Sequence, residues 1–285
     1  MANVSLSEIG LPIIFALFVW WFSTGVVLML DGLPRKGTRC SLAVATGVAA
    51  LALFGLARTA QDDSVASAYA AFVFALLVWG WQELGFLTGR VTGPRKHATP
   101  SGGSELTRFV HAVQAILYHE LAIIASGLAV AAVTWGAPNQ VGAWTFLVLW
   151  VMRISAKLNL FLGVRNTGAE FLPPHLAYLT SFFRTRPMNL LFPVSVTAAT
   201  VVATILVANA LDPLATPTAT AGLMLVAALL GLAIVEHWMM VLPVRVTALW
   251  EWAMRAQGKG RPQSAPLESP SERLAPLDVL PRHGV

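Results

Sequence analysis

The chain has 285 residues, of which 56% are apolar and only 12% are Asp, Glu, Lys or Arg. A soluble globular protein carries about 25% charged residues, so this chain has roughly half the charge needed to cover a water-exposed surface. The composition excludes a soluble enzyme, a collagen-like fibre and an intrinsically disordered chain, and it indicates an all-α polytopic membrane protein. Basic membrane-flanking loops explain the net charge of +5, so we expect no nucleic-acid partner.

Seven apolar runs, each close to the length of about 20 residues that crosses a bilayer as a helix, follow one another along the chain. They are Ile9–Leu30, Cys40–Ala57, Val65–Gly89, Leu106–Trp135, Val141–Val164, Leu190–Leu211 and Ala219–Pro243. Lipid offers the backbone no hydrogen-bond partner, so each run is expected to be helical. We therefore predict a seven-helix transmembrane domain over residues 1–255, followed by a disordered cytoplasmic tail over residues 256–285.

The distribution of Lys and Arg predicts how these helices are oriented. Of the 19 Lys and Arg residues, sixteen fall on one side of the predicted helices, one falls on the other side and two lie inside a span. The positive-inside rule then places the N-terminus in the periplasm and the C-terminus in the cytoplasm. This arrangement requires an odd number of spans, which agrees with seven.

Residues 165–189, between the fifth and sixth runs, form a connection that is longer than a simple turn. Pro174 is suited to open a helix, and Leu176, Leu179 and Phe182 recur at helical spacing. We predict a helix that lies in the cytoplasmic interface. It either connects two spans or docks a partner.

Five ionisable residues lie inside the predicted spans, where each charge costs about 2.5 to 3.5 kcal/mol. They are Glu83, Glu120, Arg153, Lys157 and Glu236. They come from four helices and lie at overlapping depths, so we expect them to pair inside the bundle. Arg153 and Lys157 are four residues apart and therefore share one face of the fifth helix, which should point inward.

The sequence leaves several uses of this cluster open. An ion-pair network that fixes helix register and packing is one use, and a proton or ion path is another. Alternatively, Glu83, His119, Glu120, Glu236 and His237 are candidate ligands for one or two metal ions or for a tetrapyrrole. Two features weigh against a metal. The neighbours His119 and Glu120 point about 100° apart, and the Glu-x-x-His signature of di-iron bundles is absent.

One block of the chain resembles a known family. The residues are Arg153-Ile-Ser-Ala-Lys-Leu-Asn-Leu-Phe-Leu-Gly-Val-Arg-Asn166, then Glu170-Phe-Leu-Pro-Pro-His175, Tyr178 through Phe183, and Arg186-Pro-Met-Asn-Leu-Leu-Phe-Pro-Val-Ser-Val-Thr197. They resemble the photosynthetic complex assembly protein 2 family, also called PuhE. The block covers about 45 residues, and the length and apolar profile agree over most of the chain.

The resemblance implies a multi-pass protein of the inner, or intracytoplasmic, membrane of anoxygenic phototrophic bacteria. Such a protein assembles the photosynthetic reaction centre and light-harvesting complex or supplies their bacteriochlorophyll, with those subunits or pigment-synthesis proteins as partners beside the lipid bilayer. The family provides no catalytic residues that can be carried over. The alternative is a membrane metalloenzyme that acts on a pigment, a quinone or a lipid through the intramembrane His/Glu cluster.

Overall fold

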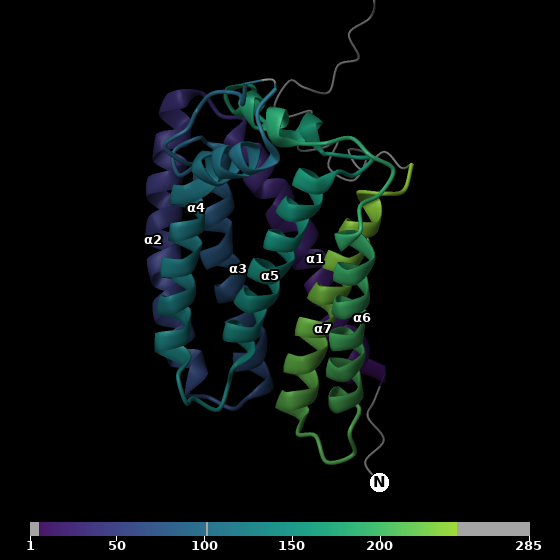
Figure 1. Cartoon of the computed structure of the whole chain (residues 1–285). Coiled ribbons are helices and arrows are strands. Elements are labelled where there is room, and N and C mark those ends of the chain that lie inside the picture. Colours follow the sequence, from purple (N-terminus) through teal and green to yellow (C-terminus); the bar gives the residue numbers. More distant parts are fainter. Residues whose placement is uncertain (1–5, 101, 244–285) are drawn as a thin grey trace, which may run out of the picture.

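The structure, a computed structural model, describes residues 6–100 and 102–243 and shows a bundle of long helices (Figure 1). In chain order these are α1 (Leu6–Asp31), α2 (Arg35–Ala60), α3 (Val65–Leu87), α4 (Glu105–Thr134), α5 (Val141–Leu162), α6 (Leu191–Ala210) and α7 (Pro217–Met239). All seven are long and apolar enough to cross a membrane, which confirms the expected all-α fold with seven spans. The largest difference from the predicted bounds is at α2, which begins at Arg35 rather than Cys40. The expected disordered tail, residues 256–285, lies outside the described residues.

The connections gather at two ends of the bundle that differ in charge (Figure 1). One end holds the α1–α2 turn at residues 32–34, the α3–α4 loop at residues 88–104 and the α5–α6 connection at residues 163–190. We call it the basic end, because these connections and the helix turns beside them carry ten of the thirteen Lys and Arg residues in the described part of the chain. The positive-inside rule predicts that the basic end faces the cytoplasm, and this orientation stays a prediction.

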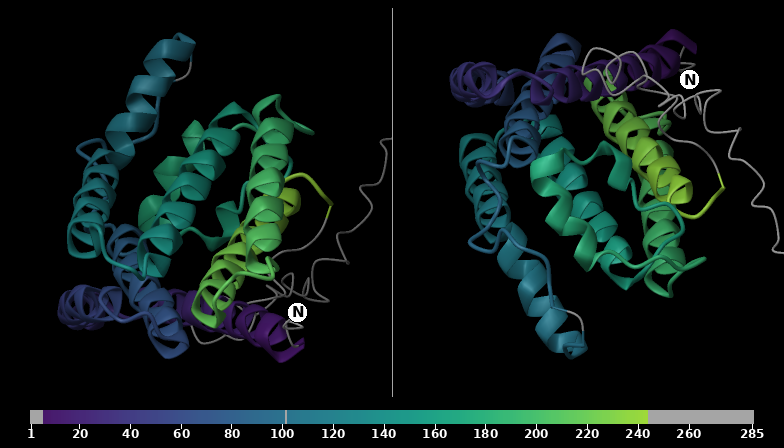
Figure 2. Two further views of the ribbon diagram at one scale, coloured as in Figure 1. Left: turned by 90° about the horizontal axis from the view of Figure 1, so that it is seen from below. Right: turned by 90° about the horizontal axis from the view of Figure 1, so that it is seen from above.

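Two helices, α3 and α7, form the centre of the bundle. In the most apolar window of each, 56% of the residues are buried, against 11–22% in the other five helices. Helix α3 contacts α1, α2, α4, α5 and α7, and helix α7 contacts α1, α3, α5 and α6. Viewed down the long axis, α1 and α2 flank α3 along one edge (Figure 2). The five outer helices therefore present much of their apolar surface to the surroundings of the bundle.

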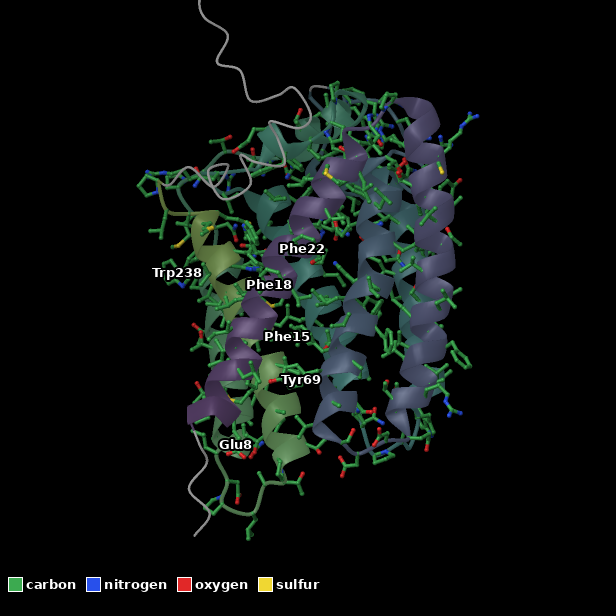
Figure 3. All side chains as sticks on the ribbon, turned by 180° about the vertical axis from the view of Figure 1, so that it is seen from behind. Glu8, Phe15, Phe18, Phe22, Tyr69 and Trp238 are labelled. Atoms are coloured by element: carbon green, nitrogen blue, oxygen red, sulfur yellow. The ribbon has the colours of Figure 1, made fainter. Side chains whose placement is uncertain are left out.

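Helix α1 is an outer helix with one face packed against the bundle and the other face exposed. On its inner face, the ring of Phe15 packs edge-on against Tyr69 of α3, with the centroids 4.9 Å apart. Phe18 and Phe22 stack on each other at 5.8 Å and stay exposed, and Figure 3 shows these side chains along α1. Since lipid chains are as apolar as these rings, such exposure suits a helix at the membrane-facing surface.

Local sequence signals start three of the helices. Ser64, Ser104 and Thr216 are the N-cap residues of α3, α4 and α7, and each side chain accepts a hydrogen bond from the backbone N–H three residues later. These bonds satisfy backbone donors that the first turn of a helix leaves unpaired. Pro217, the first residue of α7, has no N–H to lose and a fixed φ that suits this position.

The α3–α4 loop packs its backbone directly on α4. The N–H of His119 donates to the carbonyl oxygen of Thr92 at 2.9 Å, and the N–H groups of Arg90 and Val91 donate to Gly85. Gly93 permits this approach, because a Cβ atom there would lie 2.0 Å from the Gln114 carbonyl oxygen. The loop is thus a packed part of the basic end.

The α5–α6 connection covers the basic end with two short 3₁₀ helices, η1 (Ala169–Phe171) and η2 (Pro174–Phe182). The η2 helix begins at the expected Pro174, but it has 3₁₀ geometry where a regular interfacial helix was predicted. Its apolar side chains Leu176, Leu179 and Phe182 are buried in a core cluster that also contains Phe86 and Ala115 of α3 and α4. The Val164 N–H donates to Arg184 and the Arg186 N–H donates to Val164, each at 3.1 Å, which ties the two ends of the connection together.

Gly93→Ala tests the packing of the α3–α4 loop. The added methyl group meets backbone atoms of α4, so the loop has to move away, and the backbone around the exposed tryptic sites Arg90 and Lys96 becomes more mobile. We expect limited trypsin digestion of the purified protein to cut this loop several times faster than in the wild type.

Gly103→Ala is the matched control in the same loop, because its nearest neighbour would be a Thr107 methyl group at 3.8 Å. Equal cleavage rates in the two variants would show that the loop is not held against α4.

Candidate functional site

The two cations inside the bundle both project from α5 and pair with different helices. The Arg153 guanidinium donates to the Glu83 carboxylate of α3 at 2.9 Å, and the Lys157 ammonium donates to the Glu120 carboxylate of α4. The four side chains are partly shielded, with exposed fractions of 37%, 18%, 20% and 23% for Arg153, Glu83, Lys157 and Glu120. The i, i+4 spacing of the cations thus brings α3 and α4 to neighbouring positions on one face of α5.

Glu236 brings α7 into the same group of charges. Its carboxylate lies within electrostatic range of Arg153 and Glu83 and interacts with the Trp20 side chain of α1. The residue itself is exposed on the surface of the bundle. The cluster defined by Glu83, Glu120, Arg153, Lys157 and Glu236 therefore contains three carboxylates and two cations, and it extends from the centre of the bundle to the side where α1 and α7 meet.

The two histidines of the candidate ligand set have different surroundings. His237 is 2% exposed, its Nδ1 lies 2.8 Å from the Ala233 carbonyl oxygen, and its Nε2 lies 2.8 Å from the Ser155 hydroxyl. Because a carbonyl oxygen only accepts, Nδ1 carries the proton and Nε2 accepts from Ser155. Both nitrogens are satisfied, so His237 acts as a polar link between α5 and α7.

His119 is fully buried, and neither ring nitrogen has a hydrogen-bond partner in the described structure. The imidazole packs against the ring of Phe86, with centroids 4.6 Å apart. With no exposed surface, the ring is out of reach for a flat macrocycle unless the helices separate.

The candidate metal ligands do not converge on one point. Among residues 6–100 and 102–243, no group of three or more His, Cys, Asp or Glu side chains is arranged to hold a metal ion. Glu83 and Glu120 already pair with Arg153 and Lys157, and His237 is occupied by Ser155. A resident metal would need ligands without bound cations, so the observed donor set does not fit one.

The sequence counts Arg108 only among the sixteen Lys and Arg residues on one side of the predicted helices, but in the structure its side chain joins three segments. The guanidinium donates to the carbonyl oxygens of Phe182 at 2.8 Å and Phe161 at 3.0 Å. It also lies 3.6 Å from the centre of the Phe161 ring and pairs with Glu105 at 3.3 Å. Arg184 contacts the same carboxylate. The start of α4, the end of α5 and the end of η2 are thus held by one side chain whose planar fork suits several acceptors.

A second set of residues that sequence reasoning passed over consists of asparagines. Asn189 donates to the carbonyl oxygen of Gly163 at 2.9 Å and to the side chain of Asn159 at 3.0 Å, and it accepts from the N–H groups of Leu191 and Phe192. Asn189 therefore satisfies a backbone carbonyl at the end of α5 and two backbone N–H groups at the start of α6. Asn166 donates to the Met239 carbonyl oxygen at 2.7 Å, which satisfies the end of α7. One feature of the sequence could have predicted these contacts: Asn159 places an amide side chain, which needs hydrogen-bond partners, inside an apolar run.

Comparison with known proteins shows the family. Residues 6–261 match a family described as "Protein of unknown function (DUF3623)". The chain belongs to this family. The matched range contains all five residues of the charge cluster and the whole α5–α6 connection. One relative is described as "Uncharacterized 30.4 kDa protein in puhA 5'region" of Rhodobacter capsulatus; it is 39% identical over 263 residues, which cover 91% of this chain and 92% of the relative. No solved structure matches the chain.

A double-mutant cycle tests the Lys157–Glu120 pair. Lys157→Met and Glu120→Leu each leave one charge without its partner, and we expect each to lower the free energy of unfolding by about 3 kcal/mol. The double variant should recover most of the loss, because neither side chain is then charged. Unfolding by SDS from mixed micelles, followed by tryptophan fluorescence, measures these differences.

Glu105→Gln is the control, since the Glu105 side chain is 65% exposed and its removal should change stability little. A double variant that loses the sum of the two single losses would show that the charges do not act as a pair.

His119→Leu separates packing from ligand binding. Leucine has a similar volume and no nitrogen to leave unpaired, so we expect a melting temperature equal to or above that of the wild type. Circular dichroism in detergent measures it, and absorbance spectra and metal content of both preparations follow in parallel. An unchanged melting temperature together with loss of a bound metal or pigment would contradict a packing role.

Proposed function

We propose that this protein is a multi-pass inner-membrane factor for the assembly of the photosynthetic reaction centre and light-harvesting complex, or for the supply of their bacteriochlorophyll. The observation that carries the proposal is the relative described as a protein in the puhA 5' region of Rhodobacter capsulatus, which is similar over nearly the whole of both chains. In our proposal, that region is part of a photosynthesis gene cluster. The resemblance of residues 153–197 to the photosynthetic complex assembly protein 2 family points in the same direction.

The geometry favours an assembly role over the metalloenzyme alternative. Four of the five ionisable side chains of the charge cluster form two ion pairs, and His237 is satisfied by its neighbours. A membrane metalloenzyme would instead need converging ligands, and the described residues contain no such group. In our proposal the charge cluster sets the shape of the bundle, and the outer helix faces and the connections of the basic end contact photosynthetic subunits or pigment-synthesis proteins.

The proposed orientation places the basic end in the cytoplasm and the start of α1 in the periplasm. In this orientation, the connections of the basic end are the segments that a partner approaching from the cytoplasm would meet first. The Arg108 contacts make this end a firm surface, because they fix η2 on α4 and α5.

Deletion of the relative's gene in Rhodobacter capsulatus tests the proposal. We expect the deletion to lower the near-infrared absorbance of the reaction centre and its core antenna severalfold under phototrophic induction. A gene for this chain, supplied in trans, should restore part of that absorbance. Unchanged absorbance in the deletion strain would overturn the assembly role.

Two further measurements separate the alternatives within the proposal. Purified protein that carries bacteriochlorophyll would favour pigment supply, whereas pigment-free protein that co-purifies with reaction-centre subunits would favour assembly. The Glu120→Leu/Lys157→Met double variant then tests the cluster itself: it should restore absorbance if the charges serve only to hold the helices together. A double variant that is stable but does not restore absorbance would show that the charges have a chemical role.

A further inference from the structure

A polar cleft of about 560 Å³ lies at the basic end, separate from the charge cluster. Three parts of the chain line it. Residues 31–33, 38 and 39 come from the end of α1, the α1–α2 turn and α2; residues 88–90, 92 and 96 come from the α3–α4 loop; and residues 173–176 and 178 lie around the start of η2. Clefts of about 300 to 1,000 Å³ are the size that holds small-molecule ligands in proteins. The ion pairs of the bundle do not use this volume, and the proposed assembly role assigns it no ligand.

The charge of the lining indicates the kind of ligand. Arg39, Arg90 and Lys96 line the cleft, and Asp31 is its one carboxylate. The three cations are exposed, and none takes part in an ion pair within the described part of the chain. Three cations against one acid give an excess of positive charge around a concave site, which attracts anions.

The remaining walls favour phosphate with an apolar group attached. Pro173, Pro174 and Leu176 supply an apolar wall from the η2 side, and Leu33 supplies one from the α1–α2 turn. Arginine forks pair with two phosphate oxygens at once.

The α3–α4 loop, which carries Arg90 and Lys96, is held in place by α4. Thr92 lines the cleft and is 1% exposed, and its carbonyl oxygen accepts from the His119 N–H of α4. On the opposite wall, the His175 ring donates from Nε2 to the Leu87 carbonyl oxygen at 2.8 Å and lies against Gly89, whose φ of +70° suits glycine. The cleft thus has fixed walls before any ligand arrives, which lowers the entropic cost of binding.

We propose that this cleft binds the phosphate group of an anionic amphiphile. The phosphate lies between Arg39, Arg90 and Lys96, and the attached apolar part lies along the proline wall. A phospholipid headgroup and a soluble phosphorylated metabolite share this chemistry. The position of the cleft beside α1 and α2, each with only 11% of its apolar window buried, brings it close to the lipid.

Calorimetric titration of the full-length protein in neutral detergent tests the proposal with three probes. These are dioctanoyl phosphatidylglycerol, dioctanoyl phosphatidylcholine as the zwitterionic comparison, and glycerol 3-phosphate. We expect saturable one-to-one binding of phosphatidylglycerol and at least several-fold weaker binding of phosphatidylcholine. Tighter binding of phosphatidylglycerol than of glycerol 3-phosphate identifies a lipid headgroup, and the reverse order identifies a soluble phosphate compound; both outcomes support the phosphate site.

Arg90→Gln and its matched control Arg165→Gln locate the binding. Both arginines are exposed in connections of the basic end, but only Arg90 lines the cleft. We expect Arg90→Gln to weaken binding about fivefold, the effect of one cation near an anionic surface, and Arg165→Gln to leave it within about twofold. Lys96→Gln gives a second cleft variant if Arg90→Gln does not fold. Equal weakening by the cleft and control variants, or the absence of saturable binding by any probe, overturns the proposal.

Discussion

The cost of placing a cation in an apolar bundle is the constraint on which the helix arrangement depends. Arg153 and Lys157 project from one face of α5, and each needs a carboxylate at its own depth. Glu83 meets this need from α3 and Glu120 meets it from α4. Apolar contacts alone leave the relative heights of helices in lipid poorly specified, because lipid chains offer similar contacts. Two ion pairs one helical turn apart therefore define how α3 and α4 sit against α5.

A second constraint acts at the basic end, where helices stop and their last carbonyl groups need partners. Asn189 and Asn166 satisfy the ends of α5 and α7, and Arg108 donates to carbonyl groups at the ends of α5 and η2. These side chains come from connections or helix starts that are far away in sequence. The α5–α6 connection is long because it has to cover this end and deliver Asn166 and Asn189 to different helices.

The seven spans could be predicted from the sequence because charges are absent from the apolar runs and gather between them. The central position of α3 and α7 could not be predicted from the sequence, because a helix that faces lipid and a helix that faces protein are both apolar on all sides. The high energy of an unpaired charge in the bundle predicted that Arg153 and Lys157 would pair with carboxylates. Which of the two cations pairs with Glu83 and which with Glu120 depends on how the helices are placed, and the sequence does not show this. His119 and His237 are the same residue type, and each is next to a glutamate in the sequence. Only the three-dimensional arrangement gives Nε2 of His237 the Ser155 hydroxyl as a partner and leaves both ring nitrogens of His119 without one in the described structure.

Two groups of charge without a balancing partner among the described residues lie near α1. Glu236 is the carboxylate of the charge cluster that belongs to neither ion pair, and it reaches the surface, where it meets Trp20 of α1. At the basic end, the excess of positive charge in the cleft begins at the turn where α1 meets α2. Helix α1 contacts the central helices α3 and α7 more than its sequence neighbour α2. A lipid or a protein that docks along α1 would thus meet the carboxylate of Glu236 within the bundle and the cations of the cleft at its end. The two balanced ion pairs deeper in the bundle keep that helix arrangement in place.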